Sequence, residues 1–154
     1  MPRKNNYKQG WYIPENPNKY MGNGAVKYRS SYEQRLFYYL DNEDNVLAWG
    51  SESIAIPYIF ELDNSQHRYY PDVIATIRTK DGTIKRLVIE VKPYKQTLPP
   101  ARSKKISSKN THRFDEDMTM FIKNKNKWDA ADLYCKKNNL EFVIMTEIDI
   151  YNLK

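Results

Sequence analysis

The sequence predicts an α/β or α+β domain in which helices flank a mixed central sheet, and three observations lead to this fold class. A helix-capping signal stands at Ser30, an Asp-Gly turn lies at 80–82 between two β-rich runs, and a helical segment at 118–138 precedes an apolar strand at 140–146. The last strand is reached through a helical crossover, which makes the sheet mixed. With 154 residues, one domain is expected.

Residues 1–28 are expected to form an irregular N-terminal arm, and residues 29–154 a single folded domain. The arm contains three prolines and several asparagines and has no periodic apolar face. Its basic residues alternate with tyrosines and a tryptophan, and Glu15 is its one acidic residue. This composition suits contact with a phosphate backbone, although a solvated, flexible face would have the same composition.

The first helix is expected to begin after Ser30 and to continue to about Leu40. Ser30 is the predicted N-cap, and Glu33 at the third helical position completes a capping box. The residues predicted for its buried stripe are Tyr32, Leu36, Tyr39 and Leu40. A polar loop at 41–45 ends the helix, and residues 46–49 with 53–58 are expected to form one interrupted, edge-like strand.

A hairpin is predicted next, with strands at 69–79 and 83–92 around the turn at 80–82. Antiparallel pairing brings the start of the first strand beside the end of the second, so Asp72 and Glu90 should be neighbours. The two-residue period of a strand places Glu90 and Lys92 on one face, with the apolar residues between them on the other. Both carboxylates are therefore expected at the same end of the sheet.

Three prolines after the hairpin lead into a strongly basic segment, 102–113, which is expected to be a loop or a short helix. It has five lysines and arginines and no acidic residue. The helix predicted at 118–138 carries Trp128, Ala131 and Cys135 on one face, which favours a core position for Trp128 over stacking on a base. The strand at 140–146 is apolar enough to lie inside a sheet.

Composition excludes several function classes. The apolar runs are strand-sized, so no membrane span and no membrane partner are expected, and no secretory signal follows the N-terminus. The single cysteine rules out an internal disulfide, and two histidines with one cysteine cannot complete a structural zinc site. The net charge of +6 is a mild basic excess. We therefore expect a cytosolic protein that contacts nucleic acid.

Asp72, Glu90 and Lys92 are the strongest candidates for chemistry. Two carboxylates that converge on one point make a hard oxygen site suited to Mg²⁺ or Mn²⁺, and a nearby ammonium can orient or deprotonate a water molecule. These are the requirements of phosphodiester hydrolysis. Each residue also has a plain structural interpretation, because Glu90 and Lys92 could be a same-face ion pair, and Glu33 could act only as a helix cap.

The spacing of Glu33, Asp72, Glu90 and Lys92 on these elements resembles the PD-(D/E)xK nuclease superfamily. The chain from about 9 to 147 is similar to the head-completion nucleases of T-even-type tailed phages, which are related to TnsA-type endonucleases. The segments that carry this similarity are 28–33, 56–58, 67–72, 89–100 and 127–131.

This resemblance implies a restriction-endonuclease-like core, an Mg²⁺-dependent endonuclease and a role in phage head completion. It assigns catalysis to Glu33, Asp72, Glu90 and Lys92, with the three carboxylates as metal ligands. It further implies that the protein acts in the host cytoplasm or stays with the virion. Lys92 fits the family pattern for the group that activates water better than His67, which is an alternative base.

Double-stranded DNA is the expected substrate, and the predicted DNA-binding residues are Arg68, Lys95, Gln96, Arg102, Lys104, Lys105 and Lys109. Each of them has the alternative of being an ordinary surface residue. Portal, neck or terminase proteins are candidate partners, and a homodimer would suit cleavage of both strands. A second hypothesis of another class is a DNA- or portal-binding head-completion protein that retains the nuclease fold as a scaffold.

Overall fold

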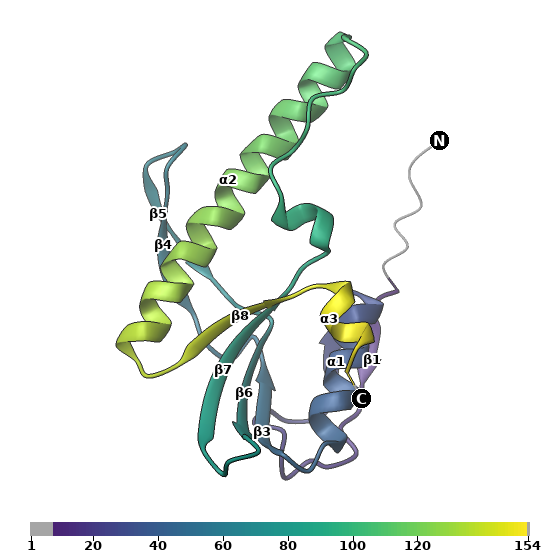
Figure 1. The fold of residues 1–154 in the computed structure, drawn as a ribbon, viewed down its shortest axis with the longest axis vertical. Coiled ribbons are helices and arrows are strands. Elements are labelled where there is room, and N and C mark those ends of the chain that lie inside the picture. Colours follow the sequence, from purple (N-terminus) through teal and green to yellow (C-terminus); the bar gives the residue numbers. More distant parts are fainter. Residues whose placement is uncertain (1–7, 154) are drawn as a thin grey trace.

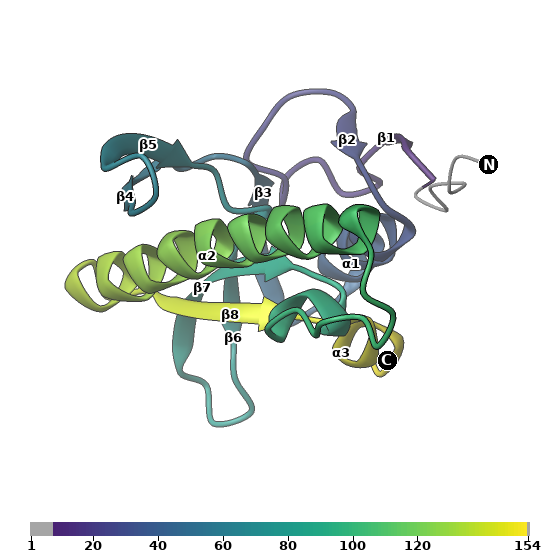
Figure 2. The same cartoon turned by 90° about the horizontal axis from the view of Figure 1, so that it is seen from above.

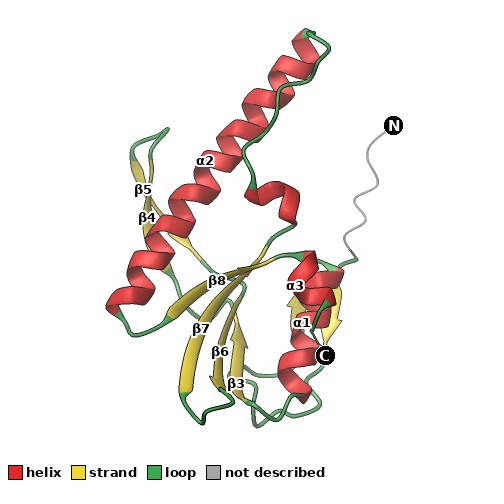
Figure 3. Ribbon diagram, in the orientation of Figure 1, coloured by secondary structure: helices red, strands yellow, loops and turns green. Residues whose placement is uncertain are grey.

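The computed structural model describes residues 8–153, and its helices and strands are shown in Figures 1 and 3. In chain order the elements are β1 (Gly10–Tyr12), β2 (Val26–Tyr28), α1 (Ser31–Asn42), β3 (Val46–Ser51), β4 (Ile56–Phe60), β5 (Ser65–Tyr69), β6 (Val73–Arg78), β7 (Ile84–Val91), the 3-10 helix η1 (Tyr94–Thr97), α2 (Ser108–Lys137), β8 (Glu141–Met145) and α3 (Glu147–Tyr151). No helix within residues 8–153 has the length and apolar character needed to cross a membrane.

The central sheet is mixed, as predicted. Its strand order is β3-β6-β7-β8, with antiparallel pairing of the first three strands and parallel pairing of β8 with β7. A parallel neighbour requires a crossover connection, and α2 supplies it. The α/β class with helices around a mixed sheet is therefore confirmed.

Helices cover both faces of the sheet (Figure 2). On one face, side chains of β6 and β7 pack with α1 and α3 around the fully buried Trp49 of β3. On the other face, Ile74 and Val88 pack against Cys135 of α2. Successive side chains of each strand point to opposite faces, so the sheet separates two cores. Since Asp72, Glu90 and Lys92 share the strand parity of Ile74 and Val88, they belong to the face that α2 covers.

The structure corrects the predicted strand boundaries. The strand expected at 69–79 is two strands, because β5 ends at Tyr69 and β6 begins at Val73, with Pro71 between them. Proline has no N–H for a strand ladder, and β5 instead pairs with β4 in a separate two-stranded ribbon. The segment at 53–58, expected to continue the first strand, likewise belongs to that ribbon as β4.

The structure also contains more helix than the sequence predicts. The second helix begins at Ser108 rather than at 118, with Ser107 as its N-cap, so half of the basic segment is helical. Its first turns carry charged residues without an apolar stripe, since this half of α2 extends past the end of the sheet (Figure 1). The short helix α3 was not predicted. It is capped by Thr146 and Asp149, which form a reciprocal capping box.

The N-terminal segment is more regular than expected in the part that the structure describes. Strands β1 and β2 pair antiparallel, and Val26 is buried in the main core. Asp41, a fully buried residue of α1, holds this segment through three hydrogen bonds to one carboxylate. The donors are the Tyr12 hydroxyl at 2.6 Å, the Glu15 N–H at 2.7 Å and the Asn16 N–H at 3.2 Å. Residues 1–7 of the predicted arm lie outside the described residues.

Replacement of Asp41 with Ala should lower the free energy of unfolding by on the order of 3 kcal/mol, because buried donors lose a charged acceptor. Chemical denaturation followed by circular dichroism measures this change. Asp44→Ala is the matched control, since Asp44 is exposed in the loop that follows α1. Equal losses in the two variants would show that Asp41 does not anchor the N-terminal segment.

Candidate active site

The register of the β6–β7 hairpin brings Asp72 and Glu90 together. Val73 pairs with Ile89, so Asp72 stands just outside β6 beside the last residues of β7. One carboxylate oxygen of Asp72 accepts a 2.7 Å hydrogen bond from the Val91 N–H. The predicted proximity of the two carboxylates is therefore confirmed. The backbone of β7, at Val91, holds the side chain of Asp72, the residue that precedes β6.

Glu90 is held from two sides. It is buried, with 7% of its surface exposed, and its Oε2 accepts a 2.5 Å hydrogen bond from the Tyr69 hydroxyl. Its Oε1 lies 3.5 Å from the Lys92 ammonium, as the same-face arrangement on β7 predicts. Burial, with help from the negative charge of Glu90, raises the pKa of Tyr69, so this phenol remains a hydrogen-bond donor at neutral pH.

Glu33 reaches the site from the first turn of α1. The Ser30 hydroxyl accepts from the Glu33 N–H at 3.1 Å, which confirms Ser30 as the cap. The Glu33 carboxylate accepts from the N–H of Arg29 at 2.9 Å. In a reciprocal capping box the donor would be the N–H of the N-cap residue, Ser30. It lines a hollow of about 390 Å³ together with Lys92 and Gln96.

Arg29 and Glu52 link the two carboxylate-bearing segments. The Arg29 guanidinium forms an ion pair with the Glu52 carboxylate, and the Glu52 N–H donates to the Asp72 carbonyl at 3.1 Å. Glu52 adopts a positive φ of 48°, a conformation that is strained for a residue with a side chain. The loop after β3 is thereby fixed between the start of α1 and the residue before β6.

Burial and like charge both oppose ionisation of the clustered carboxylates. Burial raises the pKa of Asp72 to about 8, with further contributions from Glu90 and Glu33. Burial likewise raises the pKa of Glu33, although the hydrogen bond from Arg29 acts in the opposite direction. Like charges held together in a low dielectric resist ionisation, and a cation placed among them would relieve this cost.

The donor chemistry of the three carboxylates fits a hard divalent cation. Mg²⁺ and Mn²⁺ prefer carboxylate oxygens, and the contacts described for Glu33 and Asp72 occupy one oxygen of each. Across residues 8–153, however, no three His, Cys, Asp or Glu side chains are arranged closely enough to hold a metal ion. The carboxylates therefore share a charge environment without forming a closed ligand set in this structure.

Two residues that the sequence did not single out also belong to this environment. Tyr69 ends β5, and Lys127 of α2 places its ammonium 5.7 Å from the centre of the Tyr69 ring. Burial lowers the pKa of Lys127, and the nearby Glu90 acts against this effect. No local pattern could reveal Lys127, because it is far in sequence from the other residues and approaches them only through the packing of α2.

The predicted DNA-binding residues fall into two groups. Gln96 lines the hollow beside Lys92, and Lys95 is exposed on the same turn, η1. The other group lies on the segment before α2 and on its first turn, and consists of Arg102, Lys104, Lys105 and Lys109. The Arg102 guanidinium lies 4.4 Å from the centre of the Phe114 ring. The basic residues thus form one set beside the site and one along the projecting half of α2.

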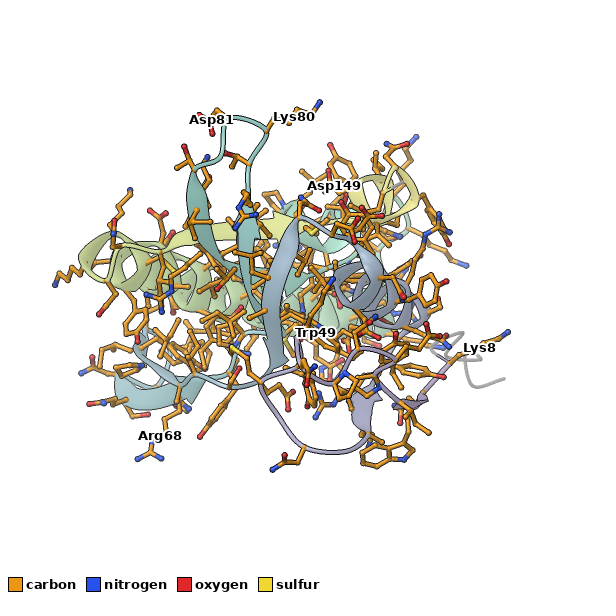
Figure 4. All side chains as sticks on the ribbon, turned by 90° about the horizontal axis from the view of Figure 1, so that it is seen from below. Lys8, Trp49, Arg68, Lys80, Asp81 and Asp149 are labelled. Carbon is orange, nitrogen blue, oxygen red and sulfur yellow. The ribbon has the colours of Figure 1, made fainter. Side chains whose placement is uncertain are left out.

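Arg68 and His67 are directed elsewhere. Arg68 is exposed on β5 and extends outward from the β4–β5 ribbon (Figure 4). His67 Nε2 lies 2.7 Å from an Asp63 oxygen, and its ring stacks on Tyr58. His67 is therefore engaged within the ribbon, which weakens its case as a general base. Trp128 packs in the core between α2 and the ribbon, as predicted.

Comparison with known proteins gives two matches. Residues 43–147 match the family described as TnsA-like endonuclease N terminal, a range that contains Asp72, Glu90 and Lys92. The chain is also 34% identical over 139 residues to a head completion nuclease of Enterobacteria phage T4, and the match covers 90% of each chain. Most of the candidate site therefore lies in the part of the chain that the family covers.

Asp72→Asn should remove a pH dependence of stability. The folded protein retains a proton on Asp72 up to about pH 8, whereas the unfolded chain releases it near pH 4, so the free energy of unfolding falls as pH rises between them. The amide side chain of the variant keeps an acceptor for the Val91 N–H and cannot ionise. Thermal denaturation in EDTA should show that the variant gains stability over the wild type as pH rises from about 5 to about 8.

Asp81→Asn is the control for this measurement. Asp81 is exposed at the tip of the β6–β7 hairpin (Figure 4), and hydrogen bonds to the Thr79 hydroxyl and the Thr83 N–H lower its pKa to about 2. Its substitution should leave the wild-type slope between these pH values unchanged. A difference between Asp72→Asn and the wild type that stays constant with pH would contradict the raised pKa of Asp72.

Proposed function

The chain belongs to the TnsA-like endonuclease family, whose fold is restriction-endonuclease-like, and we propose that it is a divalent-metal-dependent DNA endonuclease that acts in phage head completion. The observation that carries this proposal is the meeting of Asp72, Glu90 and Lys92 at the end of the β6–β7 hairpin. The match to a head completion nuclease supports the biological role. The place proposed for this role is the host cytoplasm, during virion assembly.

Asp72 and Glu90, helped by Glu33, would hold one or two Mg²⁺ ions, and Mn²⁺ suits the same ligands. A bound Mg²⁺ offsets charge on the scissile phosphate and lowers the pKa of water. Lys92 is half-buried and lies beside Glu90, where its N–H groups can orient the attacking water or, when neutral, accept its proton. The Tyr69 hydroxyl donates to one oxygen of Glu90 and would keep this carboxylate oriented for binding the ion.

DNA would be held through its backbone. Gln96 and Lys95 lie beside the site, and the segment before α2 brings Arg102, Lys104, Lys105 and Lys109 along the projecting helix. Lysine and arginine contacts to phosphates position a duplex without reading its sequence. We therefore expect cleavage of double-stranded DNA with little sequence preference.

A non-catalytic role is the second candidate, in which the protein binds DNA or the portal during head completion and the nuclease fold serves as a scaffold. The observation that favours it is the lack of a closed ligand set among Glu33, Asp72 and Glu90 in the part of the chain that is described. The intact set of carboxylates and lysine argues against it, because a scaffold has no need for buried like charges.

Glu90→Ala/Lys92→Ala should abolish metal-dependent cleavage of plasmid DNA, with a loss of more than about 1,000-fold in rate. Supercoiled and linear plasmid are incubated with purified protein in Mg²⁺, Mn²⁺ or EDTA and analysed on agarose gels. Lys85→Ala/Glu141→Ala is the matched control, since it removes an exposed ion pair between β7 and β8. Cleavage by the site variant at the control's rate would disprove the assignment.

Complementation in infected cells separates the two candidates. Asp72→Ala and Lys92→Ala are supplied to a phage whose own copy of the gene is inactive, and completed heads are counted by electron microscopy and plaque titre. If catalysis is required, both variants should fail although circular dichroism shows them folded. Full complementation by both would support the scaffold role, and the Lys85→Ala/Glu141→Ala protein should complement in either case.

A further inference from the structure

Lys127 is a half-buried cation of α2 that has no ion-pair partner among the described residues. Lys136, nine residues later on the same helix, by contrast pairs with Asp132 at 2.8 Å. Charged side chains that leave water are normally paired with an opposite charge. The ammonium of Lys127 therefore occupies a position in which an anion would be stabilised.

The surroundings of Lys127 place it at the candidate active site. Its ammonium lies 5.7 Å from the centre of the Tyr69 ring, and the hydroxyl of that ring donates to Glu90. Its charge interacts with those of Glu90, Asp72 and Lys92. Because Glu90 and Lys92 lie on the face of the sheet that α2 covers, the two lysines approach Glu90 from different elements.

We propose that Lys127 binds a phosphate of the DNA backbone at the cleavage site, so that α2 supplies part of the active centre as well as the crossover. This inference rests on the proposed function. A phosphodiester near Glu90 would meet the ammonium of Lys92, the residue after β7, and that of Lys127 from α2. Cations placed where charge develops in phosphoryl transfer stabilise the transition state more in a water-poor site than in bulk water.

A purely structural role is the rival explanation. An ammonium over an aromatic ring contributes to stability, and Lys127 would then serve only to pack Tyr69. The two roles differ in one measurable quantity. A lysine that neutralises a phosphate releases counterions from DNA, so its removal changes the salt dependence of binding, whereas a packing role leaves that dependence as it is.

The test compares Lys127→Ala and Lys127→Arg with Lys125→Ala. Lys125 is exposed and lies two residues earlier, about 200° around the helix, so its substitution removes the same charge from the other side of α2. Binding of a fluorescent DNA duplex is measured by anisotropy in EDTA over a range of salt concentrations. Plasmid cleavage in Mg²⁺ and thermal stability are measured on the same proteins.

In Lys127→Ala, the slope of log affinity against log salt should decrease in magnitude by about 0.9, as expected for one lost phosphate contact. Cleavage should fall roughly 100-fold. Lys127→Arg should restore the slope, and Lys125→Ala should match the wild type in both measurements. A wild-type slope in Lys127→Ala, whatever its stability, would overturn the inference.

The same experiment distinguishes failure of this inference from failure of the proposed function. If the wild-type protein cleaves under no metal condition, the endonuclease proposal fails, and the salt slopes still decide whether Lys127 contacts phosphate. If the wild type cleaves and Lys127→Ala cleaves at the same rate with the same slope, only the inference about Lys127 fails.

Discussion

The register of the β6–β7 hairpin is the constraint on which the rest of the site depends. The turn at its tip sets this register, with Gly82 at a positive φ of 86° and the Asp81 carboxylate accepting from the Thr83 N–H. Because side chains alternate along a strand, a slip of one residue would turn Glu90 and Lys92 toward the opposite core. The pairing in place instead sets Asp72 against the Val91 N–H, at the end of β7.

Backbone and hydroxyl donors, more than cations, stabilise the clustered carboxylates. Asp72, Glu33 and Glu90 accept from the Val91 N–H, the Arg29 N–H and the Tyr69 hydroxyl. These donors orient the carboxylates but leave their mutual repulsion largely uncompensated, which adds to the effect of burial in raising the pKa of Asp72 to about 8. The arrangement is costly for an isolated fold and suits a site that receives a divalent ion and a phosphate.

Sequence patterns predicted the structure correctly where it depends on an interaction between residues close in the chain. Ser30 caps α1 as predicted, and the Asp-Gly turn forms the hairpin, because both depend on residues within one turn of the chain. The prediction of one strand at 69–79 was wrong because residues on both sides of Pro71 have high β-propensity, although the two halves pair with different partners. The early start of α2 was missed because that half of the helix packs on no sheet and therefore shows no apolar period.

The sequence by itself determined the fold class, the hairpin and the juxtaposition of Asp72 with Glu90, since turn chemistry and strand alternation are properties of adjacent residues. It also placed Glu33 at the start of α1. Only the tertiary structure decided that Tyr69 holds Glu90, that Arg29 joins Glu33 to the loop after β3, and that Lys127 faces this centre. These contacts join separate elements, and their geometry depends on how a helix and a ribbon pack on the sheet.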